Sequence, residues 1–225
     1  MGDELYIGLS GARAAARQLE ATANNAANTS TTGFKASRMA WELYEGELAG
    51  VGDMVADSSD AAIAHDGDPL HFAVQGDAWL VVQVGDEQLL TRDGTFHQDA
   101  QGMVVNRDGH PLVTTQGPLT LEPGQELTVL RNGMLHVDGL EQGKLLLKSA
   151  EVVEPVGGNL YVSDETGEPT DFAVTQGALE SSNSDPVRTM TSLIEASRYF
   201  DAMQKLLQAA DEMTQRANRS AGGSS

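Results

Sequence analysis

The chain has 225 residues, of which 14 are basic and 33 are acidic, and its formal net charge is −19. No basic patch could dominate so negative a field, which argues against nucleic acid or an anionic membrane surface as a partner. The absence of cysteine excludes disulfides, a thiolate nucleophile and a cysteine-ligated metal, and the 40% hydrophobic content suits one moderate domain with extensions.

The N-terminal residues predict a helix with one apolar stripe. Its spacings alternate between four and three, which is the period of a supercoiled helical seam. The stripe consists of Leu5, Leu9, Ala12, Ala16, Leu19, Ala23 and Ala26. Only its leucines are large, and each contributes roughly 1.5 to 3 kcal/mol when buried. Pairing with a second helix of the same chain is one interpretation, but so thin a stripe favours a helix that orders against several neighbours in an assembly.

Polar residues predict the end of this helix near Asn28. Asn24 and Asn25 precede it, and the run from Thr29 to Gly33 consists of residues that favour caps and turns over helix interiors. Two interpretations of the asparagines stay open. They mark either a fraying helix end or side-chain amides that hydrogen-bond the backbone where a helix bundle opens into a loop.

The middle of the chain predicts an antiparallel β domain over residues 70–175, preceded by a linker or extended segment over 36–69. Short apolar runs are separated by turn pairs, and Asp-Gly and Asn-Gly between such runs are the strongest short hairpin signals. The turn pairs are Gly76-Asp77, Gly85-Asp86, Asp93-Gly94, Asp108-Gly109 and Asn132-Gly133.

Asp185 followed by Pro186 predicts the start of a C-terminal helix, because aspartate caps helices and proline is tolerated in the first turn. Its apolar stripe reads Leu193, Ala196, Phe200, Met203, Leu207, Ala210, Thr214 and Ala217. The fold class is therefore α+β, with a central antiparallel β domain and N- and C-terminal helices that form a coiled-coil-like pair. Residues 1–35 and 176–219 form the terminal helical domain, and residues 220–225 form a flexible tail.

The residues give no positive support for an enzyme. The five histidines are scattered without metal-ligand spacing, and no phosphate-binding loop or dinucleotide motif is present. Ser10 misses the nucleophile-elbow pattern by one residue and falls on a predicted helix. We therefore predict no catalytic residue, no cofactor and no metal. A hydrolase or ligand-binding β domain is the alternative from another class, and it would require a pocket in the middle of the chain.

Several short motifs follow one another along the chain. They are NNAAN (24–28), TTGFK (31–35), QGDAWLVV (75–82), TRDGTF (91–96) and QGALESSN (176–183), with Ile194, Arg198, Tyr199 and Phe200 in the last helix. In this order they closely resemble the motifs of the bacterial flagellar axial proteins, which form the rod and hook. The short stretch from Lys35 to Gln75 and Trp79 are similar to the proximal-rod type, and a distal-rod or hook-type subunit is the alternative.

The resemblance implies a structural subunit of the flagellar basal-body rod, located in the periplasm-spanning rod and exported without a cleaved signal peptide. The implied partners are other rod and hook-basal-body subunits and the flagellar export apparatus, with no nucleic acid and no direct membrane insertion. The terminal helices would form the inner tube. The residues expected at its assembly interface are Leu5, Leu9, Leu19, Asn24, Asn25, Asn28, Gly33, Phe34, Leu193, Tyr199, Phe200 and Leu207.

Overall fold

The computed structural model describes residues 2–39, 43–44, 47–48 and 54–222, with side chains for 10–39, 54–210, 212, 213 and 216. The chain divides into two compact units. The helical unit consists of Met1–Ala27, Arg38–Met54 and Pro186–Ser225, and the β unit consists of Asn28–Ser37 and Val55–Asp185. An N-terminal and a C-terminal helix thus flank an antiparallel β region, so the predicted α+β class is confirmed.

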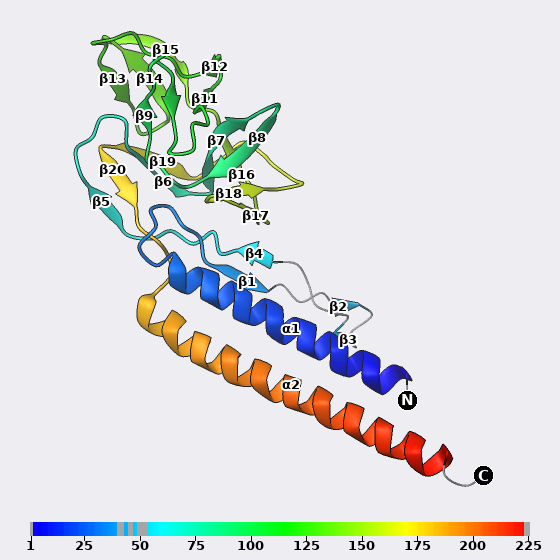
Figure 1. Ribbon diagram of the computed structural model, residues 1–225. Helices are drawn as coiled ribbons and strands as arrows, with labels where there is room; N and C mark the ends of the chain where they lie inside the picture. Colours follow the sequence, from blue (N-terminus) through cyan, green and yellow to red (C-terminus); the bar gives the residue numbers. More distant parts are fainter. Residues whose placement is uncertain (1, 40–42, 45–46, 49–53, 223–225) are drawn as a thin grey trace. The chain divides into compact units, whose positions relative to one another are not determined.

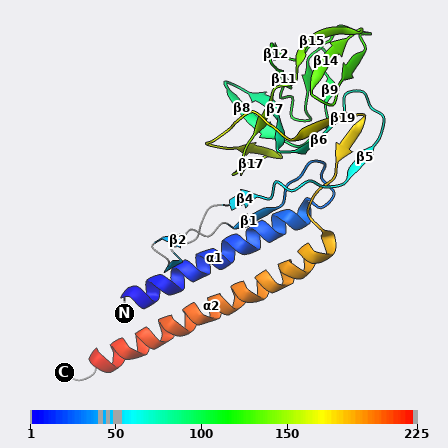
Figure 2. The ribbon, with the colours of Figure 1, turned by 180° about the vertical axis from the view of Figure 1, so that it is seen from behind.

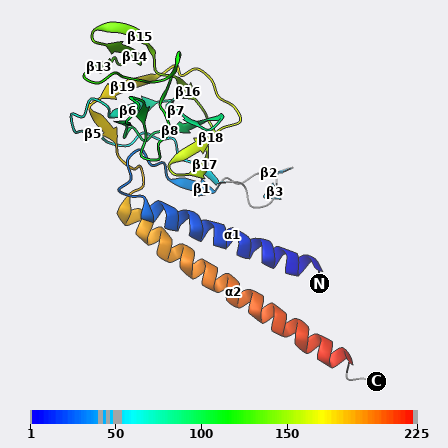
Figure 3. The same ribbon diagram turned by 45° about the horizontal axis from the view of Figure 1, so that its top comes forward.

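Two long helices, α1 (Gly2–Ala27) and α2 (Pro186–Gly222), lie side by side and run in opposite directions (Figures 1, 2 and 3). The predicted helix end near Asn28 and the predicted helix start at Asp185-Pro186 are both confirmed. The predicted tail is wrong for residues 220–222, which continue α2 because adding a turn to an existing helix needs no new nucleus. Residues 223–225 lie outside the described residues. Neither described helix has an apolar stretch long enough to cross a membrane.

One face of α2 is shielded from solvent. Between residues 191 and 210, the side chains that are at least partly buried are Leu193, Ala196, Phe200, Met203, Leu207 and Ala210. They are the predicted stripe as far as Ala210, with its alternating spacings of three and four, and the side chains of Thr214 and Ala217 lie outside the described residues. Across from it, a Cβ placed on Gly11 of α1 would lie 3.8 Å from the Met203 sulfur, so the helix backbones approach closely there.

The shielded face of α1 differs from the predicted stripe. Ala16 and Ala23 are exposed, whereas Ala15 and Thr22 are buried. The Thr22 hydroxyl donates to the carbonyl of Gln18 over 2.8 Å, which satisfies its polar group inside the helix. The predicted positions Ala16 and Ala23 are therefore wrong for the face that is covered in the single chain.

The β unit is built from small antiparallel sheets. The largest has the order β16 (Leu147–Ser149), β7 (Ala78–Val84), β8 (Glu87–Thr91), β18 (Leu160–Val162) and β17 (Glu154–Gly157). A second sheet contains β13 (Leu127–Val129), β14 (Met134–Val137) and β15 (Leu140–Lys144). The paired strands are β19 (Phe172–Gln176) with β6 (Phe72–Gly76), β20 (Ala178–Glu180) with β5 (Ile63–His65), β10 (Val104–Val105) with β9 (His97–Gln98), and β11 (Val113–Thr114) with β12 (Gly117–Pro118).

Short strands also occur between α1 and the β region. The strand β1 (Ser37–Met39) pairs with β4 (Met54–Ala56), and β2 (Leu43–Tyr44) pairs with β3 (Glu47–Leu48). The predicted extended character of residues 36–69 therefore includes paired strands, of which β5 is the last.

Strand β7 is buried on both faces and separates two hydrophobic cores. Leu80 and Val82 belong to the larger core, which includes Leu135, whereas Trp79 and Val81 belong to the smaller one. Because successive side chains of a strand point to opposite faces, the continuous apolar run of β7 supplies both cores.

The predicted turn pairs have two different roles. Gly85-Asp86 joins β7 to β8, and Asn132-Gly133 joins β13 to β14, as expected for hairpins. The interpretation of Gly76-Asp77 as a hairpin turn is wrong, because β6 and β7 belong to different sheets. Asp93-Gly94 is not a hairpin turn either, and a Cβ on Gly94 would overlap the backbone of Phe72. Glycine at position 94 therefore serves close backbone packing.

Candidate functional site where the two connectors meet

Two connectors lie next to each other within the β unit. The N-terminal connector, residues 28–37, follows α1, and the C-terminal connector, residues 178–185, precedes α2. The backbone N–H of Gly33 donates to the carbonyl of Glu180 over 2.7 Å. Motifs from opposite ends of the sequence are thus brought into direct contact.

Gly33 has a conformation and an environment that only glycine satisfies. Its φ is +62°, in the left-handed region that glycine adopts without steric cost. A Cβ at this position would overlap the backbone of Arg92 and Asp93. Phe34 follows directly and is buried at 7% exposure. The N-terminal connector is therefore pressed against the end of β8.

Glu180 lies at the centre of the contact and is fully buried. Strand β20 pairs with β5, and the alternation along β20 directs Glu180 inward. Its Oε1 accepts hydrogen bonds from the Lys35 Nζ at 2.7 Å and from the Ala61 N–H at 2.8 Å. Its Oε2 accepts from the Arg92 guanidinium at 3.4 Å. One carboxylate therefore serves two cations.

Arg92, which follows β8, is also fully buried. Its guanidinium donates to the Val74 carbonyl at 2.9 Å, to the Asp60 carboxylate at 3.1 Å and to the Gly76 carbonyl. It lies over the Trp79 ring at 5.0 Å from the ring centroid, a cation–π arrangement. These contacts link the ends of β6 and β8 to the connectors.

We call Lys35, Asp60, Arg92 and Glu180 the Glu180 cluster. Its two cations face two carboxylates, and only the Asp60 side chain, at 37% exposure, reaches solvent. Burial lowers the pKa of Lys35, and the nearby Glu180 carboxylate opposes this shift. Removing an ion from water costs several kcal/mol, which only close partners offset. Each cation therefore depends on Glu180.

Tyr161 and Asn159 hold the N-terminal connector from a second side. The Lys35 N–H donates to the Tyr161 hydroxyl over 3.1 Å, and this hydroxyl donates to the Asn159 Oδ1 over 3.1 Å. The Asn159 side-chain amide donates to the Thr32 carbonyl over 2.8 Å. These side chains take the place of a strand partner for the connector backbone.

Asn183 holds the C-terminal connector against its counterpart. Its Oδ1 accepts from the Ala36 N–H at 2.7 Å, its side-chain amide donates to the Asp57 carbonyl at 2.8 Å, and its own N–H donates to the Phe34 carbonyl at 3.2 Å. The side-chain amide also donates to the Ser59 carbonyl at 3.3 Å, so a single asparagine bonds four separate backbone positions.

The buried Tyr161 hydroxyl should make the stability of the protein depend on pH. Burial raises the pKa of Tyr161 to about 12. The unfolded tyrosine titrates near pH ~10, so it loses its proton first, and the free energy of unfolding should fall by ~1–3 kcal/mol as the pH rises from ~10 to ~12. Urea unfolding of the wild type and of Tyr161→Phe across this range would show a smaller pH-dependent loss in the variant.

The lowered pKa of Lys35 has the opposite sign, because stability rises with pH where the unfolded state holds more protons. Lys35 is present in both proteins, so its contribution cancels in the difference between the two pH profiles. Parallel profiles for the wild type and Tyr161→Phe would contradict the assignment of the pH dependence to Tyr161.

The predicted interface residues lie in two places. Gly33 and Phe34 are in the N-terminal connector, as described. Asn28 is the first residue of this connector, where its Oδ1 accepts from the Thr31 hydroxyl at 3.0 Å and its carbonyl accepts from the Thr31 N–H at 3.1 Å. Its amide therefore stabilises the turn that follows α1. Leu19, Asn25, Leu193, Phe200 and Leu207 are partly buried on the helices, and Asn24 and Tyr199 are exposed. The side chains of Leu5 and Leu9 lie outside the described residues.

The charged residues of the cluster were missed as a site. Lys35, Arg92 and Glu180 each lie inside a motif that resembles the axial proteins, but no pattern in the sequence predicts that the three act together. Their charge is the sequence feature that could have indicated the site. Two cations and one anion stand beside buried apolar neighbours in three motifs that are far apart along the chain.

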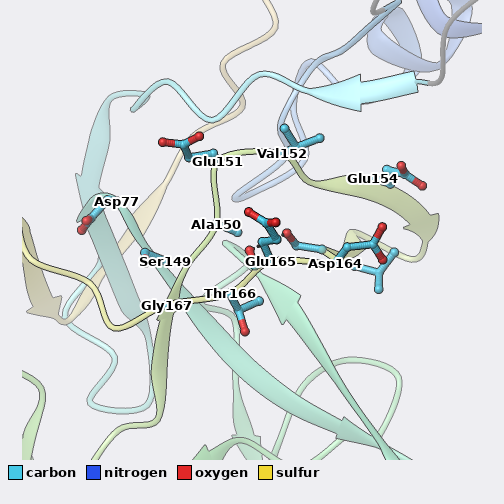
Figure 4. Close-up of a pocket in the computed structure, with 12 residues that line it drawn as sticks. Asp77, Ser149, Ala150, Glu151, Val152, Glu154, Asp164, Glu165, Thr166 and Gly167 are labelled. Carbon is cyan, nitrogen blue, oxygen red and sulfur yellow. Dashed lines mark hydrogen bonds between the residues drawn. The ribbon is translucent and has the colours of Figure 1, made fainter.

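A separate pocket of about 720 Å³ opens on the β unit (Figure 4). Its acidic lining residues are Asp77, Glu151, Glu154, Asp164 and Glu165. Asp77 accepts from the backbone of Thr170 and Asp171, and the Ser163 hydroxyl donates to the Glu165 carbonyl. The described residues that line this pocket include no histidine, lysine or arginine. Among the described residues, no three metal-ligating side chains converge.

Family models match three parts of the chain. A model described as flagella basal body rod protein matches residues 5–35, one described as flagellar hook protein FlgE/F/G D1 domain matches 73–137, and one described as flagellar basal body rod FlgEFG protein C-terminal matches 175–220. The first and third matches include the connector segments that meet at Glu180.

Curated relatives cover the whole length. The flagellar basal-body rod protein FlgF of Mesorhizobium japonicum is 31% identical over 100% of both chains. FlgF of Escherichia coli is 28% identical over 97% of this chain and 98% of its own. The rod protein FlgG of Bacillus subtilis is 26% identical over 94% and 96%.

Proposed function

Because the chain belongs to the family of flagellar basal-body rod proteins, we propose that its terminal helices are the elements by which it assembles into the rod. Its family is structural rather than enzymatic, and the chain is a structural subunit of the flagellar basal-body rod that assembles with other rod and hook components. The proposal concerns how it does so. In it, α1 and α2 pair as a coiled coil in the inner layer, and the β unit forms the outer layer.

An exposed apolar stripe on α2 carries the proposal. Tyr199, Leu206 and Met213 are seven residues apart and are 50%, 63% and 65% exposed. Ala202 and Ala209 stand between them and are exposed as well. The stripe therefore repeats the spacing of a helical seam beside the face that is already covered. Burying each large side chain is worth roughly 1.5–3 kcal/mol, which a neighbouring helix would supply.

The exposed alanines of α1 support the same arrangement. Ala16 and Ala23 are seven residues apart on the face that is open in the single chain, and alanine permits close approach of another helix. We propose that they meet helices of neighbouring subunits. The predicted interface residues Leu5, Leu9, Leu19, Leu193 and Phe200 would then form the seam within each subunit, together with Leu207.

The charge distribution suits an inner and an outer layer. The helical unit carries 8 basic and 11 acidic residues, a net charge of −3, whereas the β unit carries 6 and 22, a net charge of −16. Like charges that are packed together in a tube wall repel each other. The helical unit, whose charges nearly balance, is therefore better suited to burial there than the β unit. The acidic unit is better placed toward water.

We further propose that the subunit occupies the proximal rod and is exported from the cytoplasm through the flagellar export apparatus without a cleaved signal peptide. The proximal position is supported by the FlgF relatives, and FlgG relatives keep the distal rod as the second candidate. Labelling the protein in isolated basal bodies distinguishes the two positions. Signal at the distal end of the rod would overturn the proximal assignment.

Leu206→Asp should abolish incorporation into the rod. A charge at the centre of the exposed stripe could not be buried against a neighbouring helix without a large desolvation cost. The helix content of the purified monomer should stay unchanged, because Leu206 is 63% exposed there. Complementation of a strain that lacks the gene, followed by immunoblotting of isolated basal bodies, measures incorporation.

Gln204→Asp is the matched control, since it adds the same charge to another exposed position of α2. It should incorporate as the wild type does. Normal incorporation of Leu206→Asp would show that the stripe is not an assembly surface.

A further inference from the structure

We infer that the Glu180 cluster is a positioning clamp, which fixes the two connectors to each other within the β unit. The inference rests on the proposed function, because an assembling subunit must present its helices in one arrangement. It goes further by assigning that role to buried charges that lie outside both helices.

The backbone alone fixes the connectors weakly. Strand β20 of the C-terminal connector pairs with β5, and β1, which begins at the last residue of the N-terminal connector, pairs with β4, so no ladder joins the two connectors among the described residues. Backbone hydrogen bonds between them join Gly33 to Glu180 and Asn183 to Phe34. Without a common ladder the connectors can shift along each other, because register in a sheet is normally set by a ladder.

Side chains of the cluster remove that freedom. The Lys35 ammonium donates to Glu180 at 2.7 Å, where the bond is buried, and to the Ser59 carbonyl at 2.7 Å, where it is partly buried. A shift of either connector would separate Lys35 from Glu180 and leave a buried charge without its partner, which is strongly unfavourable. The ion pair thus selects one alignment of the connectors.

Arg92 ties this alignment to the rest of the β unit. It bonds Glu180 on one side and the carbonyls of Val74 and Gly76 on the other. The carboxylate that aligns the connectors is therefore itself held by a side chain whose position β6 and β8 determine. A buried ion pair contributes little net stability but can select one arrangement of the chain over others. The Glu180 cluster has this role for the alignment of the two connectors.

The absence of cysteine permits a direct test on the full chain. Cysteines introduced as Ser30→Cys and Ser181→Cys place spin labels on exposed positions of the two connectors. Electron paramagnetic resonance should give one narrow distance distribution in the otherwise unchanged protein. Glu180→Gln keeps the side-chain shape and removes the charge, and it should broaden the distribution or split it. Glu141→Gln, on exposed β15, should leave it narrow.

Leu135→Ala separates alignment from general stability. Leu135 is fully buried in the larger core, away from the connectors, so its truncation lowers stability without touching the clamp. The distribution should stay narrow in this variant. An unchanged distribution in Glu180→Gln, or equal broadening in Leu135→Ala, would overturn the inference. If the wild type did not incorporate into the rod, the proposed function would be refuted. The distances between the spin labels would still test whether the Glu180 cluster aligns the connectors.

Discussion

Replacing Glu180 by alanine should lower the free energy of unfolding of the β unit by ~3–5 kcal/mol, the range expected when a buried ion pair loses one partner. The loss is large because Lys35 and Arg92, both without exposed surface, share this carboxylate. Asp60 remains beside Arg92 but is partly exposed, and Lys35 keeps only the Ser59 carbonyl. Urea unfolding followed by tryptophan fluorescence measures the change, since Trp79 lies in contact with Arg92.

The matched control for Glu180→Ala is Glu141→Ala. Glu141 is an exposed residue of β15, and its truncation should change the free energy of unfolding by less than ~0.5 kcal/mol. If both variants unfolded at the same urea concentration, the Glu180 cluster would not be the interaction that holds the connectors.

Gly33→Ala should be the most damaging single-methyl change in the connectors. The left-handed conformation at φ +62° costs a residue with a Cβ ~1–2 kcal/mol. The added carbon also overlaps the backbone of Arg92 and Asp93, which cannot rotate away as a side chain would. Overpacking of this kind adds a further ~1–3 kcal/mol. Urea unfolding of the variant should therefore show a loss of ~2–5 kcal/mol.

Gly85→Ala separates the two contributions. Gly85 has nearly the same conformation, with φ +60°, but nothing lies within 4 Å of the position that its Cβ would take. It should show only the conformational cost. Equal losses in Gly33→Ala and Gly85→Ala would mean that the close approach of the N-terminal connector to β8 carries no energetic weight.

The helix ends could be predicted from the sequence because local chemistry determines them. Asn28 and the threonines after it favour a turn, and Asp185 with Pro186 favours a helix start, whatever the rest of the chain does. The β class likewise followed from turn pairs such as Gly85-Asp86. Such signals act over a few residues, so no knowledge of distant contacts is needed.

The covered face of α1 could not be predicted in the same way. Alanine occupies positions 14, 15 and 16, so steps of three and four from Ala12 both give an apolar stripe. The choice between Ala15 and Ala16 depends on the side from which α2 approaches. A small residue at every candidate position removes the contrast that a hydrophobic period needs.

The Glu180 cluster could not be predicted because its members are far apart in the sequence. Lys35 and Glu180 are 145 residues apart, and a charged residue is normally expected at the surface. Gly76-Asp77 and Asp93-Gly94 were misleading for a related reason. Their glycines and carboxylates serve contacts with distant segments, although the dipeptides are those of hairpins.

The sharing of Glu180 by Lys35 and Arg92 also imposes an order on folding. Both cations precede their common carboxylate along the chain, the first of them by 145 residues. In any process that delivers the chain from its N-terminus onward, Lys35 lacks its carboxylate partner and Arg92 has only Asp60 until Glu180 arrives. The final packing of the β unit therefore requires nearly the whole polypeptide. A chain that ends before residue 180 lacks the carboxylate that Lys35 and Arg92 share in the folded protein.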